Sequence, residues 1–387
     1  MSDTKQLDSQ YIAHTYNRFD LEIVSGKGEI VQDVNGKEYI DMATGIAVNT
    51  FGHADDEWIN AVTRQINSFA HTSNLYYSRP CAELAQMLCQ RTGMSKVFFS
   101  NSGAEANECA IKAAREYAAT HKGAEYNTII TLVNSFHGRT ITTLAATGQE
   151  VFHKNFLPLT EGFVYAPAND IQAIMQLISQ HKCAAVMFET VQGEGGVNPL
   201  NYDYVTELAK VAQENDILLV CDEVQTGNGR TGKLYGYMHY GIQPDIVSTA
   251  KGLAGGLPIG ATLLGEKLAD VYNPGMHGST FGGNPVSCAA ALSVLGRIDN
   301  KLLEEVTQKS EYIKSELSSC PGIKGVTGLG LMLGIETEKS ASEVVQKCME
   351  NGVLVITAKT KVRLLPPLNI GFDNLKKAVE VIKQSCC

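Results

Sequence analysis

The sequence lacks the features that identify several common classes of protein. No Cys-X-X-Cys pair occurs among its ten cysteines, which excludes zinc ribbons and thioredoxin-type motifs. No apolar run approaches the roughly 18 residues that a membrane helix needs. The polar residues 1–19 contain no apolar signal core. Cysteines without an export signal predict a cytoplasmic protein with no membrane partner.

Positive charge is also scarce. The 32 Lys and Arg residues are outnumbered by 41 Asp and Glu residues, which gives a net charge of -9 and a pI near 5.5. Phosphate backbones require a basic surface, so this balance argues against a nucleic-acid partner. Small anionic ligands remain compatible, because local positive charge is enough to hold them. No pattern of metal ligands is present, and we expect no metal.

The length of 387 residues predicts about two domains. Near the start, strands are predicted over 21–24, 29–34 and 37–42, with a hairpin turn at Asn35-Gly36. Apolar strands then alternate with helices. The strands are predicted over 96–99, 128–133, 184–188, 217–221 and 246–249, and the helices over 104–119, 171–179, 204–214, 285–300 and 302–318.

Continuously apolar strands separated by helices are typical of a mostly parallel α/β sheet buried on both faces. We expect a large α/β domain over residues 60–290. Both chain ends, residues 1–59 and 291–387, are expected to form a smaller α+β domain. Ligands of open α/β sheets bind beyond the carboxyl ends of the strands. Residues that directly follow strands are therefore the candidates for function.

The first such segment is FSNSGAEAN, residues 99–107, where a strand ends and a helix begins near Ala104. Free N–H groups and the helix dipole make such a terminus an anion site. Ser102 adds a hydroxyl donor, and Gly103 allows close approach of the backbone. The alternative is an ordinary serine N-cap, which stabilises a helix by about 1 kcal/mol.

Two further segments follow strands. In SFHGRT, residues 135–140, Phe136 is suited to stack on a flat ring and Arg139 to bind a carboxylate bidentately. A packed phenylalanine and a surface arginine are the alternative. In ETVQGEGG, residues 189–196, glycines and carboxylates indicate a ligand-lining loop in which Glu194 is an ion-pair partner rather than a catalyst. A plain glycine-rich turn is the alternative.

The segment LLVCDEVQ, residues 218–225, places Asp222 directly after a buried strand. A carboxylate there is costly unless it is paired. A protonated ring nitrogen is a suitable partner, and Gln225 is in reach of the same ring. A Walker-B carboxylate has a similar pattern. The adjacent GNGRTGKL, residues 227–234, nearly fits a P-loop, but Leu234 replaces the hydroxyl residue and no helical pattern follows.

Lys251 ends an apolar strand and is followed by glycines in DIVSTAKGLAGGLPIG, residues 245–260. Burial lowers the pKa of a lysine, so that its neutral amine becomes a nucleophile. A lysine that faces solvent is the alternative. Downstream, HGSTFGGNP, residues 277–285, offers Ser279 and Thr280 as hydroxyl donors, which suits a phosphate or a subunit contact.

Together these segments resemble the class III, or ornithine-type, aminotransferases of pyridoxal-phosphate fold type I. The resemblance spans about residues 28–368 and rests on six motifs in order: NSGAEAN, FHGRT, QGEGG, DEVQTGNGRTG, STAKGL and GSTFGGNP. It implies a large domain with a mostly parallel sheet flanked by helices, and pyridoxal 5'-phosphate as the cofactor. It also implies a homodimer with shared active sites.

The resemblance implies roles for the matched positions in cofactor binding. Lys251 would hold the cofactor as a Schiff base and later carry the proton between the two carbon centres. Asp222 would bind the protonated ring nitrogen and keep the ring an electron sink. Phe136 would stack on the ring, and Gln225 would contact its hydroxyl group.

The phosphate and the substrate have their own implied residues. Ser102, Gly103 and Ala104 would cradle the phosphate, and Thr280 would reach the phosphate in the neighbouring subunit. The residues implied in substrate binding are Arg139, Ser279, Glu194 and Arg363. Of these, Arg139 would bind the carboxylate remote from the reacting amine.

Glu194 and Arg363, the latter within VRLLPP at residues 362–367, are implied to form a switchable pair. While they are paired, the distal amine of a diamino acid reacts. When glutamate binds, Glu194 moves away and Arg363 takes the α-carboxylate.

Within the class, two features resemble the enzymes of arginine biosynthesis that act on acetylornithine. They are the segment GIAVNTFGH at residues 45–53 and the short length of the chain. The expected small-molecule substrates are therefore acetylornithine and 2-oxoglutarate, with glutamate as a product. Alternatives are ornithine, succinylornithine, a carrier-protein-linked lysine precursor or 4-aminobutyrate. Two other classes, a P-loop nucleotide-binding protein and a cofactor-binding module of a transcription regulator, remain as remote alternatives.

Overall fold

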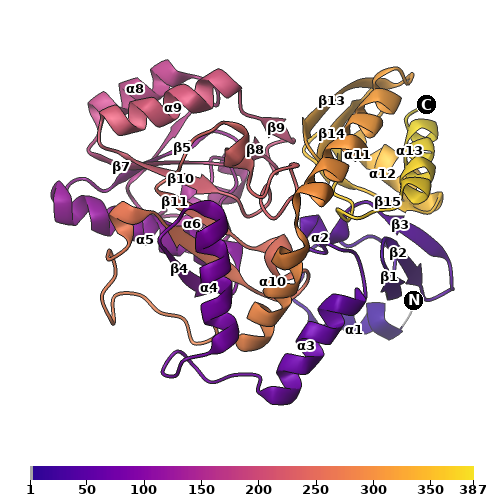
Figure 1. Cartoon of the computed structure of the whole chain (residues 1–387). Coiled ribbons are helices and arrows are strands. Elements are labelled where there is room, and N and C mark those ends of the chain that lie inside the picture. Colours follow the sequence, from indigo (N-terminus) through magenta and orange to yellow (C-terminus); the bar gives the residue numbers. More distant parts are fainter. Residues whose placement is uncertain (1–2) are drawn as a thin grey trace.

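The computed structural model describes residues 3–387, and a seven-stranded sheet forms the centre of that region. Its strand order is β4-β12-β11-β10-β7-β5-β6 (Figure 1). The strands are β4 (Lys96–Ser100), β5 (Thr128–Leu132), β6 (Phe163–Ala166), β7 (Cys183–Phe188), β10 (Leu218–Asp222), β11 (Ile246–Thr249) and β12 (Gly260–Leu264). The mostly parallel α/β sheet expected from the sequence is confirmed, and each predicted strand from residue 96 onward corresponds to one of these.

Strand β12 is the exception to the parallel arrangement. It runs antiparallel to both of its neighbours, β11 and β4. Only ten residues, 250–259, separate β11 from β12. A parallel crossover needs about a dozen residues or more, usually including a helix, so this short connection returns the chain antiparallel. Residues 250–259 consequently lie at the same edge of the sheet as the carboxyl ends of the parallel strands.

Helices cover both faces of this sheet. Val186 and Phe188 of β7 pack in one cluster with residues of α8 (Ile171–Gln180) and α9 (Tyr202–Glu214). The alternate residues Ala185 and Met187 pack in another cluster with the alanine-rich face of α5 (Gly103–His121). Successive side chains of a strand point to opposite faces, so α5 lies on the face opposite to α8 and α9, as Figure 1 shows. Burial on both faces accounts for the continuously apolar strands.

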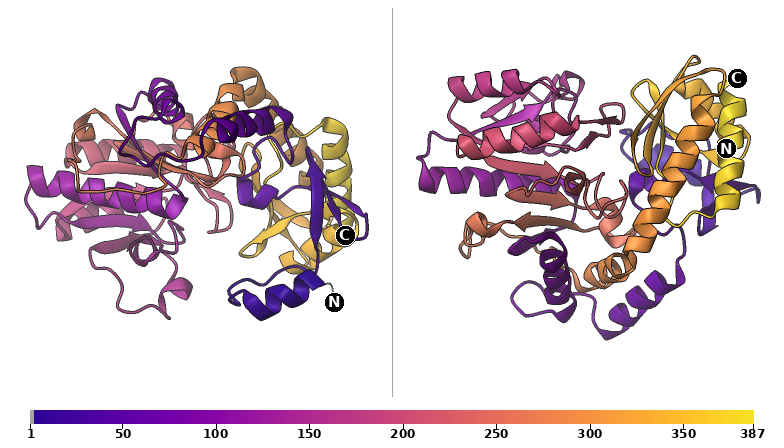
Figure 2. Two further views of the ribbon diagram at one scale, coloured as in Figure 1. Left: turned by 90° about the horizontal axis from the view of Figure 1, so that it is seen from below. Right: turned by 45° about the horizontal axis from the view of Figure 1, so that its top comes forward.

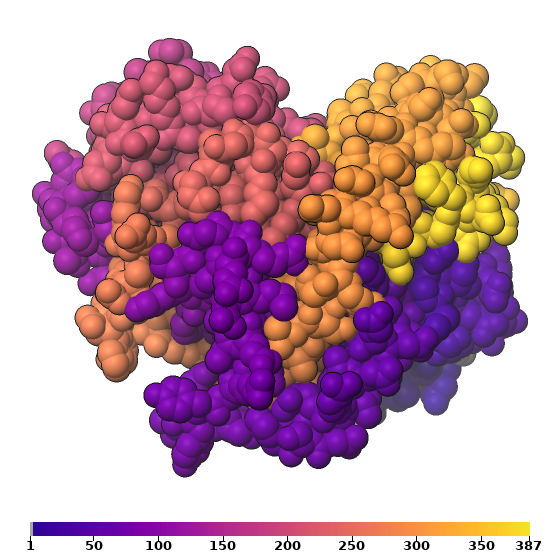
Figure 3. Space-filling model, viewed as in Figure 1, coloured from indigo at the N-terminus to yellow at the C-terminus, as the bar shows by residue number. Residues whose placement is uncertain are grey.

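The two chain ends pair with each other. Strands β1 (Ile23–Lys27), β2 (Ile30–Asp33) and β3 (Glu38–Asp41) form a sheet with β15 (Val353–Leu354), which runs parallel to β3. A second sheet has the order β13-β14-β17-β16, from β13 (Ile323–Leu329), β14 (Met332–Thr337), β16 (Ile356–Ala358) and β17 (Lys361–Leu364). The N-terminal residues therefore lie against the C-terminal residues, as the indigo and yellow surfaces of Figure 3 show.

Further helices surround these sheets and join them (Figure 2). Helix α10 packs against α3 and α4, and α11 and α13 pack together beside the C-terminal sheet. The remaining elements are α1 (Asp3–Tyr11), α2 (Thr44–Ala47), α3 (Asp56–Ser68), α4 (Arg79–Thr92), α6 (Ile141–Ala146), α7 (Glu150–His153), β8 (Val191–Gln192), β9 (Asn198–Pro199), η1 (Gly236–His239), η2 (Lys251–Ala254), η3 (Glu266–Leu268), α10 (Pro285–Arg297), α11 (Asn300–Ser318), α12 (Ala341–Glu350) and α13 (Phe372–Cys386).

Some predicted boundaries were wrong. The first strand lies at β1, two residues later than the predicted 21–24. The helix predicted over 285–300 ends at Arg297, because Asp299 caps the following helix by accepting a hydrogen bond from the Leu302 N–H at 2.8 Å. Helices α1, α3 and α4 were not predicted. None of the helices in residues 3–387 is long and apolar enough to cross a membrane.

The P-loop alternative fails on structure. After Lys233 the chain forms a single 3-10 turn, η1, rather than the α-helix whose N-terminus a P-loop needs to bind phosphate. Arg230 of the same segment is buried and donates hydrogen bonds from Nη1 to the Leu331 and Pro366 carbonyls. The segment therefore ties the region of the central sheet to the C-terminal part of the chain.

Candidate active site

A cavity of about 590 Å³ lies at the carboxyl edge of the central sheet. This volume is in the range of ligand-binding pockets. Its walls come from segments that follow β4, β5, β7, β10 and β11. Of the residues predicted from the sequence, the cavity brings together Ser102, Gly103, Ala104, Phe136, Arg139, Asp222, Gln225 and Lys251.

Asp222 lies at the end of β10 and is only 3% exposed. Its Oδ2 accepts hydrogen bonds from Asn107 Nδ2 and from His137 Nδ1, each at 2.8 Å, and its Oδ1 accepts from the Val224 N–H at 3.0 Å. These donors stabilise the ionised carboxylate in a buried place. Asp222 is therefore held in one orientation on the cavity wall.

Lys251 directly follows Ala250, the residue after β11, and its side chain borders the same cavity. Burial lowers the pKa of its amine, because the charged form loses hydration. The carboxylates of Glu194, Asp222 and Glu189 act in the opposite direction, but burial prevails. Lys251 is thus biased toward the neutral, nucleophilic amine.

The N-terminus of α5 forms another wall. Ser102 caps the helix, with its Oγ accepting from the Glu105 N–H at 3.2 Å. The first N–H groups of a helix have no intrahelical acceptor and attract anions. A side chain at Gly103 would lie 2.6 Å from a Val224 methyl carbon, so glycine is required for the helix to approach β10 this closely. The serine is therefore both an ordinary N-cap and part of an anion-binding terminus.

Phe136 and Arg139 line the cavity from the segment after β5. The Phe136 ring meets the Phe152 ring edge-on at 5.8 Å, and the Arg139 guanidinium lies over the Phe152 ring at 4.1 Å. These contacts hold an aromatic ring and an exposed cation side by side.

Glu189 borders the cavity from the end of β7, and the sequence analysis gave it no role. Its Oε2 accepts from the Phe136 N–H at 2.9 Å, and its Oε1 accepts from the Gly193 N–H at 3.2 Å. Burial raises the pKa of this carboxyl to about 7, against the opposing effect of His137. Glu189 therefore joins the segment that carries Phe136 to the loop that carries Glu194.

Glu194 and Arg363 form an ion pair beside the cavity, with Oε1 and Nη1 2.6 Å apart. Gln225 connects the pair to the cavity wall. It accepts from Arg363 Nη1 at 2.9 Å and donates from Nε2 to Glu194 Oε1 at 3.3 Å. Burial alone would raise the pKa of the Glu194 carboxyl, but Arg363 lowers it below its ordinary value. The two residues predicted to pair are thus in contact.

Ser279 and Thr280 lie outside the cavity. Ser279 Oγ accepts from Asn101 Nδ2 at 3.1 Å and from the Gly282 N–H at 2.9 Å, which ties its loop to the end of β4. Thr280 borders a separate hollow beside Tyr76 and Tyr77, which are exposed. Within one chain, neither residue reaches the group around Lys251.

Besides Glu189, other polar residues of the site were missed. Asn107 and His137 both bind Asp222, and Tyr16 borders the cavity from the segment after α1. Asn107 and His137 both stand inside recognised motifs. A polar amide or imidazole near a strand end was the signal that could have identified them as site residues. Nothing local in the sequence indicates Tyr16. No group of three His, Cys, Asp or Glu side chains in the described residues is arranged to hold a metal ion.

The donor set fits pyridoxal 5'-phosphate. A primary amine, a buried carboxyl group, an aromatic ring and a helix N-terminus surround one cavity. In the same order, these groups suit the aldehyde, the ring nitrogen, the flat ring and the phosphate of the cofactor. The His137 Nε2 and Asn107 Oδ1 atoms are buried without a protein partner in the part of the chain that the structure describes. Because both residues bind Asp222, each has one unused polar atom close to that carboxyl group.

Comparison with known proteins identifies the family. The model of the family "Aminotransferase class-III" matches residues 11–386. The chain belongs to the class III aminotransferases and is a pyridoxal-phosphate-dependent transaminase.

Relatives within the class are similar over nearly their whole length. An acetylornithine aminotransferase of Haemophilus ducreyi is 51% identical over 382 residues, which covers 98% of this chain and 97% of the relative. An acetylornithine aminotransferase of Caldanaerobacter subterraneus is 45% identical, with 97% of each chain covered. The structure of the ornithine aminotransferase of Toxoplasma gondii matches with a TM-score of 0.95 at 32% identity, covering 99% of this chain and 94% of that chain.

Proposed function

We propose that this transaminase transfers the δ-amino group of N2-acetyl-L-ornithine to 2-oxoglutarate, giving N-acetyl-L-glutamate 5-semialdehyde and L-glutamate. The observation that carries this proposal is the Glu194–Arg363 pair beside the Lys251 cavity. A site that accepts an ω-amine and an α-amino acid in turn needs a carboxylate-binding group that is available to only one of them. The acetylornithine aminotransferases among the relatives support this choice of substrate.

The cofactor would be held by the residues that surround the cavity. Lys251 would bind it covalently through its amine, Asp222 would hold its ring nitrogen, and Phe136 would pack on its ring. Gln225 is placed to contact the ring hydroxyl. The phosphate would lie at the N-terminus of α5, on Ser102, Gly103 and Ala104. Bound there, pyridoxal 5'-phosphate supplies an electron sink for the carbon that loses its proton.

Lys251 would also move the proton. Its lowered pKa favours the neutral amine, which would accept a proton from one carbon centre and deliver it to another. The Asp222 carboxyl group would hold the ring nitrogen of the bound cofactor. The roles of base and anchor therefore fall on one side chain.

Two arginines would sort the substrate carboxylates. Arg139 is exposed at the cavity and would bind the carboxylate far from the reacting amine. Arg363 is buried, and its Nη1 donates to Glu194 and Gln225, so it would accept an α-carboxylate only after Glu194 moves away. Glycines flank Glu194 at positions 193, 195 and 196, which gives its loop backbone freedom for this movement.

Thr280 and Ser279 would act across a homodimer. Thr280 would reach the phosphate in the neighbouring subunit, and Ser279 would border the substrate there. Exposed Leu75, Tyr76, Tyr77 and Phe281 surround this region and form an apolar surface suited to a second copy of the chain. With the chain division proposed from the sequence, a large domain over 60–290 and a small domain from both ends, most of the cavity lining would belong to the large domain. Tyr16, Val48 and Arg363 would belong to the small one.

A substrate panel tests the proposal. Initial rates with 2-oxoglutarate are compared for acetylornithine, ornithine, succinylornithine and 4-aminobutyrate. We expect the highest kcat/KM for acetylornithine. A higher value for any of the other three amines would overturn the substrate assignment while leaving the transaminase class intact.

A further inference from the structure

The backbone of Lys251 adopts a conformation that is rare for a residue with a side chain. Its φ is +44°, in the left-handed region. Lys251 begins the 3-10 turn η2, which ends at Ala254 and is followed by Gly255 and Gly256, with φ values of +59° and +132°. The glycines adopt such values readily, but a lysine does so only when its surroundings hold it there.

Three side chains bind the backbone of this turn, residues 250–256. Asn228 Nδ2 donates to the Ala250 carbonyl at 3.2 Å, immediately before Lys251. Thr50 Oγ1 donates to the Gly252 carbonyl at 2.8 Å, and Trp58 Nε1 donates to the Ala254 carbonyl at 2.8 Å. The three donors come from separate parts of the chain: the loop after β10, the loop before α3, and α3 itself.

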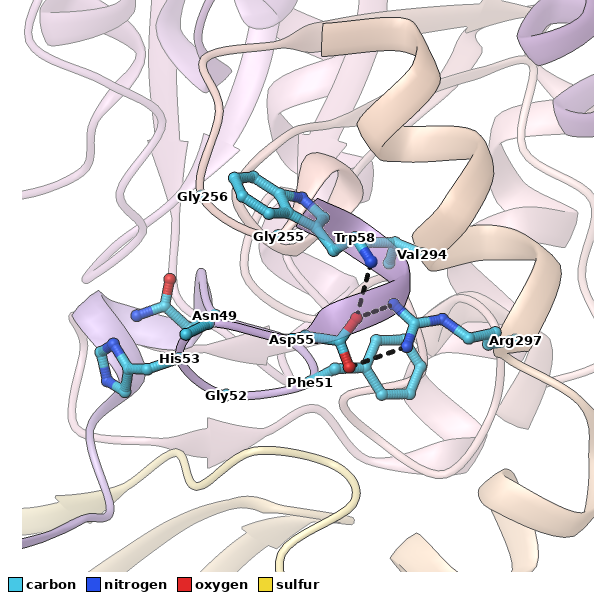
Figure 4. Close-up of a pocket in the computed structure, with 11 residues that line it drawn as sticks. Asn49, Phe51, Gly52, His53, Asp55, Trp58, Gly255, Gly256, Val294 and Arg297 are labelled. Atoms are coloured by element: carbon cyan, nitrogen blue, oxygen red, sulfur yellow. Dashed lines mark hydrogen bonds and ion pairs between the residues drawn. The ribbon is translucent and has the colours of Figure 1, made fainter. Parts of the chain in front are cut away.

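The donors are themselves fixed. Thr50 and Asn228 are only 2% and 3% exposed. Trp58 stands in the first turn of α3, whose N-cap Asp55 accepts from the Trp58 N–H at 2.9 Å and pairs with Arg297 of α10 at 2.8 Å (Figure 4). The indole lies against the turn, since a side chain at Gly255 would be 3.3 Å from the Trp58 ring.

Space exists into which the turn could relax. A cavity of about 160 Å³, lined by Trp58, Gly255, Gly256 and Arg297 among others, adjoins the turn (Figure 4). Gly256 borders both this cavity and the one that contains Lys251. Thr50, Trp58 and Asn228 do not border the Lys251 cavity. None of the three therefore touches the reacting groups directly, and the turn is the segment that links all three to Lys251.

We propose that Thr50, Trp58 and Asn228 are positioning residues that hold the Lys251 backbone in its left-handed conformation and thereby aim its amine. The inference rests on the proposed role of Lys251. A lysine amine ends a chain of four rotatable carbons, so a small rotation of the backbone moves the amine by an ångström or more. Proton transfer tolerates little misplacement of that size.

Conservative variants remove the three bonds one at a time. Thr50→Val and Asn228→Leu delete the donor at nearly constant volume, and Trp58→Phe deletes it together with one ring of the indole. We expect each to slow the amine-transfer step in single-turnover experiments about 10- to 100-fold, with little change in substrate KM. Thr50→Ser keeps the hydroxyl and is expected to retain the wild-type rate. Thr337→Val is the matched control. Thr337 is a buried residue of β14, far along the chain from the turn, and its hydroxyl also donates to a backbone carbonyl, that of Lys339, at 2.8 Å.

A double variant separates positioning from general damage. In Lys251→Ala, a small amine such as methylamine is supplied in solution as the base. Because that base does not depend on the turn, adding Trp58→Phe to Lys251→Ala should leave the methylamine-dependent rate unchanged. An equal slowing in both backgrounds would overturn the proposal, as would wild-type single-turnover rates in all three donor variants.

Hydrogen exchange gives a readout that is independent of activity. In cofactor-free protein, the amides of residues 250–256 should exchange faster in Thr50→Val, Trp58→Phe and Asn228→Leu than in wild type or Thr337→Val. Unchanged exchange in all three would show that the bonds do not hold the turn and would overturn the proposal. This measurement requires neither cofactor nor substrate, so it distinguishes failure of the positioning role from failure of the transaminase assignment.

Discussion

The Glu194 carboxylate and the Arg363 guanidinium meet at 2.6 Å although 169 positions separate them in the chain. Arg363 is 2% exposed, so it depends on Glu194 for compensation of its charge, while Gln225 accepts a further hydrogen bond. A buried cation that loses its only counter-charge recruits another anion. The switch that we propose requires a second arrangement, in which an external carboxylate replaces Glu194 beside Arg363.

Replacing Glu194 should favour the second arrangement. In Glu194→Gln we expect kcat/KM for glutamate to be unchanged or higher, and kcat/KM for acetylornithine to fall about 10- to 100-fold because Arg363 is no longer masked. Half-reaction kinetics with each amino donor measure the two values. Arg363→Ala should have the opposite effect, with the larger loss of kcat/KM for glutamate. Equal losses of kcat/KM for both amino donors in both variants would contradict the switch.

His137 should matter through Asp222. In His137→Leu, Asp222 loses a hydrogen bond of 2.8 Å, and its carboxylate becomes less well stabilised. We expect kcat to fall about tenfold, as for the loss of one charge-assisted hydrogen bond, and the cofactor to dissociate more readily. Steady-state rates and equilibrium dialysis of the cofactor measure both. Wild-type behaviour in this variant would show that Asn107 and Val224 alone suffice to hold Asp222.

Glu223 should make stability depend on pH. Burial raises the pKa of its carboxyl to about 7 from an ordinary value near 4.5. Between those two values the folded protein retains a proton that the unfolded chain releases, so this group stabilises the fold below pH 4.5 and loses that contribution as the pH rises to 7. The loss amounts to roughly 3 kcal/mol.

The matching variant is Glu223→Gln. Because glutamine does not titrate, the drop in unfolding free energy between pH 5 and pH 7.5 should be smaller than in wild type. The variant also weakens the bonds to the Gly236 and Tyr237 N–H groups, so the comparison concerns the slope with pH and not the absolute value. Urea unfolding at both pH values gives the slope, and an undiminished drop would rule out Glu223 as its source.

Arg230 should act on stability rather than on nucleotide binding. It is 2% exposed, and burial lowers the pKa of its guanidinium. Arg230→Ala leaves the Leu331 and Pro366 carbonyls without this donor and opens a cavity. We expect the free energy of unfolding to fall by about 3 kcal/mol. Denaturant unfolding measures this change. Magnesium-dependent ATP binding by the wild-type protein, abolished in the variant, would contradict the structural role of residues 227–234.

The central sheet was largely predictable because its signals are local. Continuous apolar runs such as 184–188 report burial on both faces, and the helical period reports the layers between them. Helices α3 and α4 were not predicted. In the structure α3 has no fully buried residue and α4 has only three, although Trp58 and Val62 of α3 are apolar, lie at helical spacing and pack against the core. Strand β12 was also not predicted. Its antiparallel direction depends on the length of the preceding connection, which a local apolar pattern does not report.

The site residues at strand ends were also predictable from the local sequence. Asp222 and Lys251 stand out because a charged group directly after a buried strand is costly without a function. Their neighbours were harder to find. Asn107, His137 and Glu189 become significant only through contacts with other strands, and a sequence does not show which atoms those strands bring within 3 Å.

By itself, the sequence determined the alternation of strands and helices, the positions of Asp222 and Lys251, and six motifs in the order of one family. These depend on short-range patterns of burial and charge. The tertiary structure alone decided that β15 pairs with β3, that Arg363 meets Glu194, and that Thr50, Trp58 and Asn228 converge on the Lys251 turn. These contacts join segments that are remote along the chain, and only the packing of the whole core sets their distances.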